Sequence, residues 1–322
     1  MRWPTLLVGA MIAFAWLTPV HAEVQPPAPP WEAPLARQTP LTGQIRAIRD
    51  GAKLTPDALI DRLSKADFVL LGERHDNPGH HRLQAWIAEQ LFARNRPYAL
   101  AFEMIDSSQN EALARYLATS PRDAAGLGAA LHWEKSGWPA WTHYQPIAEA
   151  ALSRGLPILA ANLSPVLVRA IAKNGLAALP APLARSLQLD PEKDSAVLTA
   201  HMTEIQAVHC GLLPVRSLSP FAIAQYARDA EMARVMTDQW HKSQERDGVV
   251  LIAGAGHART DRGVPFHLSR MAPDAQVLSL AFIEASDGQT ADADLSGLPY
   301  DFVWVTARVD DTDHCDQIRS AH

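Results

Sequence analysis

The stretch FVLLGERHDNPGHH, residues 68–81, decides the fold class of this chain. Its first four residues are all apolar, without alternation, which is typical of a strand buried on both faces of a parallel sheet. Near Pro78 a segment begins in which apolar residues recur every three or four positions, the spacing of an amphipathic helix. A buried strand joined to a helix by a short polar loop is the repeating unit of an α/β sheet.

The same apolar, strand-length pattern recurs along the chain, and helical spacing separates several of its copies. The further runs are residues 98–102, 157–160, 249–253, 277–280 and 302–305. From 165 to 243 we expect three helical segments and no strand, the last beginning at Ser219-Pro220. The predicted class is therefore α/β, a mainly parallel sheet flanked by helices. The α/β domain would comprise 42–164 and 244–322, with a small all-helical insertion subdomain at 165–243.

The composition excludes several classes of protein. The chain has 322 residues, 48% hydrophobic and 20% charged, which is too apolar for a disordered chain. The formal net charge of −6 does not favour nucleic acid as a partner. The 13 His against 2 Cys are unusual, because imidazole is a common metal ligand and proton carrier.

The first 41 residues predict export. Arg2, an apolar run over about 6–16 and the sequence Val20-His21-Ala22 indicate a signal peptide at 1–22, and no Cys for lipidation follows it. Six prolines in 23–41 indicate an extended tether. We therefore expect a periplasmic protein in an oxidising compartment, where the two Cys, Cys210 and Cys315, would form a disulfide.

Ionisable side chains gather where three of the predicted strands end. Glu73 and His75 follow the first strand, Glu103 ends the second, and His257 follows the strand at 249–253. The motif Gly-x-x-His occurs after two of the predicted strands, at 72–75 and at 254–257. Ligands of open α/β sheets bind at this edge, so these residues predict a divalent-metal or polar-ligand pocket. If a metal is bound, Glu73 or Glu103 could act as the base of a hydrolase.

Several motifs resemble the ChaN-type haem-binding family. They are residues 71–78, Glu103, 209–214, 224–233 and 254–257, in the same order over nearly all of the chain from Thr42 onward. The wider superfamily includes the Tiki proteases and the erythromycin esterases. The resemblance implies a large α/β domain that carries a small helical domain. It also implies a dimer that encloses haem, bound through a Tyr with a His from the other subunit.

The helical insertion is the expected place for haem. Between 191 and 210, one apolar stripe carries His201, Met202 and His209 among other residues. His201 and His209 are eight residues apart, about 12 Å along a helix, so they cannot both bind one iron. Tyr226 is the one Tyr of the insertion and would be the axial ligand if the family pattern holds; otherwise His201 or His209 takes that role. Arg228 and Arg216 are the candidates for holding the propionates.

Two functions remain open from the sequence. The first is a periplasmic haem-binding protein of haem or iron acquisition, a homodimer that exchanges haem with uptake components of the inner or outer membrane. The alternative is a metal-dependent hydrolase that uses the paired Gly-x-x-His site. The closer resemblance to the haem-binding family favours a binding protein over an enzyme.

Overall fold

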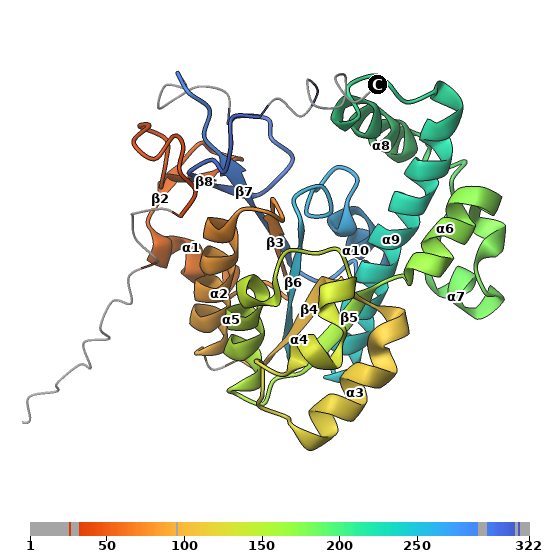
Figure 1. Cartoon of the computed structure of the whole chain (residues 1–322), viewed down its shortest axis with the longest axis horizontal. Helices are drawn as coiled ribbons and strands as arrows, with labels where there is room; N and C mark the ends of the chain where they lie inside the picture. Colours follow the sequence, from red (N-terminus) through yellow and green to blue (C-terminus); the bar gives the residue numbers. More distant parts are fainter. Residues whose placement is uncertain (1–25, 27–31, 95, 289–294, 313–314, 316–322) are drawn as a thin grey trace, which may run out of the picture.

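An eight-stranded sheet forms the centre of the computed structural model, with helices on both faces (Figure 1). The structure describes residues 26, 32–94, 96–288, 295–312 and 315. The signal peptide expected at 1–22 lies outside these residues, as do 23–25 and 27–31 of the predicted tether. The rest of the tether segment is not free of the fold: Ala33 and Leu41 are buried, and Leu35 pairs with Arg308. Within the described ranges, no helix combines the length and hydropathy that crossing a membrane requires.

The sheet is mainly parallel, so the predicted fold class is confirmed. Five parallel pairings join six strands, and β1 pairs antiparallel with both β8 and β2. The strands, in their spatial order, are β2 (Lys53–Leu54), β1 (Ile45–Ala47), β8 (Phe302–Thr306), β7 (Val277–Glu284), β3 (Phe68–Glu73), β6 (Gly248–Gly254), β4 (Tyr98–Asp106) and β5 (Ile158–Asn162).

Alternate residues of β3 face two different cores. Val69 and Leu71 pack with α1 (Pro56–Leu63), α2 (Pro78–Phe92) and α5 (Trp141–Leu152). Phe68 and Leu70 pack on the opposite face with α9 (Val215–Lys242) and α10 (Val264–Met271). Helices on both faces remove water from all six residues of β3, which explains its unbroken apolar start. The shorter helices α3 (Asn110–Thr119) and α4 (Leu127–Ala130) follow β4.

Every element between β5 and β6 is helical. They are α6 (Pro165–Asn174), a 3-10 turn, α7 (Ala181–Ser186), α8 (Ser195–Val208) and α9. The helix predicted to begin at Ser219 begins at Val215 instead, with Pro220 inside it, because a proline so near the N-terminus removes only one backbone hydrogen bond. The first half of α9 packs on α6 and α8, and its second half packs on the sheet. The division into an α/β domain and a helical insertion stays a prediction.

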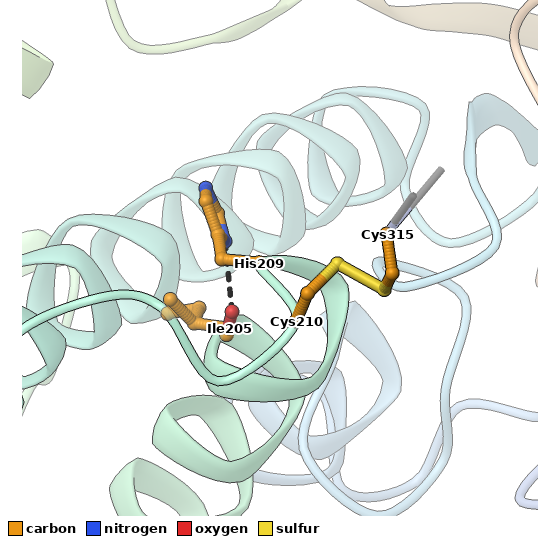
Figure 2. The surroundings of a disulfide bond; sticks show 4 residues. All are labelled: Ile205, His209, Cys210 and Cys315. Atoms are coloured by element: carbon orange, nitrogen blue, oxygen red, sulfur yellow. Dashed lines mark hydrogen bonds between the residues drawn. A yellow bond between two sulfur atoms is a disulfide. The ribbon is translucent and has the colours of Figure 1, made fainter. Parts of the chain in front are cut away.

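A disulfide joins Cys210, just after α8, to Cys315 near the C-terminus (Figure 2). The pairing predicted from the sequence is therefore confirmed. The two cysteines are 105 positions apart, so the bond ties the start of the α8–α9 connection to a residue that follows the last strand, β8.

Replacing both cysteines by serine should lower the free energy of unfolding. The bond closes a long loop, which restricts the unfolded chain by up to about 4–5 kcal/mol in the entropy model. Urea unfolding of the wild type and of C210S/C315S would measure the difference. Thiol titration of the denatured, unreduced wild type should find no free thiol; two free thiols, or identical unfolding curves, would contradict the bond's role.

Candidate functional site

The ends of β3, β6 and β4 are neighbours in the sheet, and the structure brings the four predicted strand-end residues together there. Glu73 is the last residue of β3, and His75 follows two positions later. Glu103 lies in β4 beside the end of β6, and His257 follows β6 by three residues. We call Glu73, His75, Glu103 and His257 the strand-end cluster.

The carboxylate of Glu73 is buried and bound by three side chains. Its Oε1 accepts hydrogen bonds from Nδ1 of His75 at 2.9 Å and from the hydroxyl of Tyr144 at 3.0 Å. Its Oε2 lies 2.9 Å from Nδ1 of His81. Burial acts to raise the pKa of Glu73, but the contacts with His75 and His81 outweigh it and lower the pKa. Glu73 therefore stays ionised.

Glu103 is a second buried carboxylate, and its partners come from other elements. Its Oε1 lies 2.6 Å from Nη2 of Arg228, on α9, and 3.1 Å from Nε2 of His257. Its Oε2 accepts the backbone N–H of Gly254 at 2.7 Å. Burial acts to raise the pKa of Glu103, but the charges of His257 and Arg228 hold it well below its usual value. Sequence analysis expected Arg228 at the haem; it binds this carboxylate instead.

His257 joins the strand-end cluster to the helices. Its Nδ1 lies 2.5 Å from Oδ1 of the buried Asp229 on α9. The other oxygen of Asp229 lies 3.6 Å from Nε2 of His201 on α8. Burial alone would lower the pKa of His257, but the carboxylates of Glu103 and Asp229 raise it to about 9. An unbroken chain of ionisable groups thus runs from β4 to α8.

His75 is the most exposed member of the cluster, with 33% of its side chain accessible. Nδ1 of His75 is hydrogen-bonded to Glu73, and Nε2 of His75 lies 3.9 Å from Oε2 of Glu103. The His75 ring packs on Trp138. A Cβ on Gly254 would come within 2.8 Å of that Nε2, so the ring needs a glycine there. Burial acts to lower the pKa of His75, but the bond to Glu73 and the charge of Glu103 raise it.

This geometry does not support the metal interpretation of the cluster. In the part of the chain that the structure describes, no group of three or more His, Cys, Asp or Glu residues is arranged to hold a metal ion. Oε1 of Glu73 and both oxygens of Glu103 instead accept from protein donors, while Oε2 of Glu73 is buried beside His81 without a hydrogen bond. What the structure shows is a compact cluster of two buried carboxylates and two histidines, of which Glu103 also lines a cleft.

The residues predicted to bind haem differ in their exposure to solvent. Tyr226 is fully buried, and its hydroxyl donates to Asp194. His201 is 3% exposed, because its side of α8 packs on α9. Met202 is half-buried on the same helix. Of the proposed ligands, His209 alone is exposed.

The connection from α8 to α9 carries apolar side chains on the surface. Val208, Leu212, Val215 and Phe221 are each 45–80% exposed. His209 lies among them in sequence, with its Nδ1 2.8 Å from the carbonyl oxygen of Ile205 (Figure 2). We call residues 208–221 the helical tip. The sequence did not reveal these exposed apolar residues, because periodicity alone does not separate an exposed apolar residue from a core one.

The family model of haem-binding uptake proteins, Tiki superfamily, ChaN, matches residues 59–268. The chain belongs to this family. The resemblance seen in the sequence motifs is thereby confirmed. Curated protein sequences include no match to this chain.

Solved structures share the fold of this family member. The structure described as cofacial haem binding to ChaN of Campylobacter jejuni is 23% identical, covers 84% of this chain and 98% of its own, and has a TM-score of 0.64. The type III effector HopBA1 is 15% identical over 78% of this chain and 93% of its own, with a TM-score of 0.43. A mutant of the erythromycin esterase EreC is 16% identical over 82% of each chain, with a TM-score of 0.39. The first shows the fold, and the other two are too distant to support an argument.

The raised pKa of His257 predicts a pH dependence of stability. The folded pKa of about 9 lies above the ordinary value of 6.5, so the charged ring stabilises the fold fully below about pH 6.5. This contribution, on the order of 3 kcal/mol, is lost as the pH rises through 9. Urea unfolding at pH 6 to 9 should show it, and H257Q should flatten the profile. H241Q, which removes an exposed histidine, should keep the wild-type slope; an equal slope in H257Q would contradict the prediction.

Proposed function

We propose that this chain is a periplasmic protein of haem or iron acquisition that holds haem at the helical tip, with His209 as the axial ligand. The orientation of the His209 ring carries the proposal. The carbonyl of Ile205 can only accept, so Nδ1 of His209 carries the hydrogen and Nε2 of the neutral ring keeps its lone pair. Histidines that bind metals commonly donate their other N–H in this way.

The surface of the helical tip supports haem as the ligand. Haem needs a broad apolar face, and the tip offers Val208, Leu212, Val215 and Phe221 to solvent. Arg216 is exposed next to Val215 and could hold a propionate by a charge-assisted bond. Arg228, the other candidate for that role, is occupied by Glu103. Bound haem would supply the iron, and His209 and Arg216 are the residues of this chain that would hold the haem.

The environments of the tyrosines favour histidine over tyrosine as the haem ligand from this chain. All five tyrosines are described, and each hydroxyl donates to a protein acceptor. Burial raises the pKa of Tyr226 above its usual value, and the hydrogen bond to Asp194 raises it further. Ligation through Tyr226 would require this ring to leave the core, so we assign the axial position to His209.

Dimerisation would complete the site. A short helical connection covers one face of a flat macrocycle, and the other face needs further apolar surface. A second copy of the tip would supply it, at roughly 25 cal/mol per Å² removed from water. Export fits the same function: the predicted signal peptide would direct the chain to the periplasm, where the disulfide is stable and membrane uptake components can exchange haem.

Hydrolysis at the strand-end cluster is the second candidate function, and one observation favours it. Glu73 fixes Nδ1 of His75 while the ring is partly open to solvent. A histidine oriented by a carboxylate in this way can act as a general base. The metal-dependent form of this function has no support among the residues that the structure describes.

Titration with haemin tests the axial ligand. Wild-type protein should give a saturable visible spectrum, and H209A should change the spin state and weaken binding about tenfold or more. Y226F should leave the spectrum unchanged, as should H241A, which removes an exposed histidine at the other end of α9. A changed spectrum in Y226F together with an unchanged one in H209A would show that Tyr226 is the ligand.

Sedimentation velocity tests the dimer. The wild type should become dimeric with stoichiometric haemin, while V215E should remain monomeric because a carboxylate would be desolvated in the interface. A181E places the same charge on an exposed position of α7, away from the tip, and should dimerise like the wild type. A monomeric wild type with and without haemin would contradict this part of the proposal.

A further inference from the structure

A cleft of about 800 Å³ opens beside the strand-end cluster, away from the helical tip. One wall comes from the segment after α4, which includes His132, Lys135 and Trp138, and the other comes from the start of α6. Glu103 and Arg228 belong to its lining. The Trp138 ring also packs on His75, so the cleft leads directly to the cluster.

The cleft carries two cations without an acidic partner. Arg228 is paired with Glu103. Oδ1 of Asp106 accepts hydrogen bonds from the backbone and hydroxyl of Ser108, but the carboxylate keeps its charge, so the lining has a formal excess of one positive charge. Lys135 and Arg169 are exposed on the same cleft, and neither forms an ion pair with a residue that the structure describes. An excess of positive charge in a chain of net charge −6 is a local feature that favours an anion.

The first turn of α6 adds to this positive field. Ser164 caps the helix and, with Pro165 and Val166, lines the cleft. The dipole of a helix N-terminus attracts negative charge. In α6 this effect comes from the dipole, because Pro165 has no N–H and the N–H groups of Leu167 and Val168 already donate to Ser164. This is an independent contribution, because it comes from the backbone and not from the two cations.

The remaining wall of the cleft is apolar. Trp138, Leu131 and Val168 contribute to it, and Val166 is 70% exposed at its edge. A ligand that fits this lining has an apolar body and a negatively charged group. An inorganic anion would leave the apolar wall in contact with water.

We propose that this cleft binds a small organic carboxylate with an apolar body. The carboxylate lies on the side of Lys135, Arg169 and the N-terminus of α6, and the apolar body packs on Trp138. This places the bound molecule beside Glu103, which lines the cleft, and beside Trp138, whose ring packs on His75. The proposal does not depend on haem binding at the helical tip.

Isothermal titration with 2-naphthoate, and with the neutral 2-naphthamide as its isostere, tests this assignment on the disulfide-bonded protein at low salt. Naphthoate should bind saturably, and the amide about tenfold more weakly, because charge-assisted bonds to both cations are lost. K135Q/R169Q should bind naphthoate about tenfold more weakly than the wild type. K173Q/R185Q removes two exposed cations elsewhere in the helical region and should bind it like the wild type.

Three results would overturn the proposal. The first is no saturable binding of naphthoate to the wild type. The second is equal affinity for naphthoate and naphthamide, which would show that charge plays no part. The third is an equal loss of naphthoate affinity in K135Q/R169Q and in K173Q/R185Q. That result would show that the overall charge of the protein, and not the two cleft cations, determines the affinity. All four substitutions lie on exposed side chains, so the variants should fold like the wild type.

Discussion

The buried carboxylate of Glu103 is the contact on which the arrangement of this molecule depends. It binds Arg228 of α9, the backbone N–H of Gly254 at the end of β6, and His257. A buried charge is tolerated only when it is paired, and removing one partner of such a pair typically destabilises a protein by about 3–5 kcal/mol. Glu103 therefore fixes the position of α9 against the edge of the sheet.

This constraint reaches the helical tip. Asp229, the neighbour of Arg228, binds His257 on one oxygen and faces His201 of α8 with the other. The disulfide holds the far end of α8 to the C-terminal segment. Two contacts thus attach α8, which leads into the helical tip: the contact of Asp229 with His201 and the disulfide. A binding surface on rigid elements loses less conformational entropy when a ligand binds.

The main sheet could be predicted because β3, β6 and β4 are continuous apolar runs, and the strand-end rule placed Glu73, Glu103 and His257 at one edge of it. Their convergence depends on the neighbouring order β3-β6-β4, which the sequence did not predict. The strands β1 and β2 could not be predicted, because they are only three and two residues long and each includes a charged residue. Tyr144 and His81 join the cluster through packing that no local pattern encodes. For the same reason, periodicity in α8 did not reveal that His201 faces α9 while His209 faces solvent.

The central claim is that haem binds at the helical tip and not at the strand-end cluster. A crystal structure of the protein with haemin, measured at the iron absorption edge, tests it most directly, because the anomalous signal locates the iron without interpretation of the surrounding density. If haem binds at the helical tip of a dimer, one iron peak lies next to Nε2 of His209 in each chain, and apolar tip residues of the second copy lie nearby. An iron peak beside His75 and Glu103, or beside Tyr226, would contradict it.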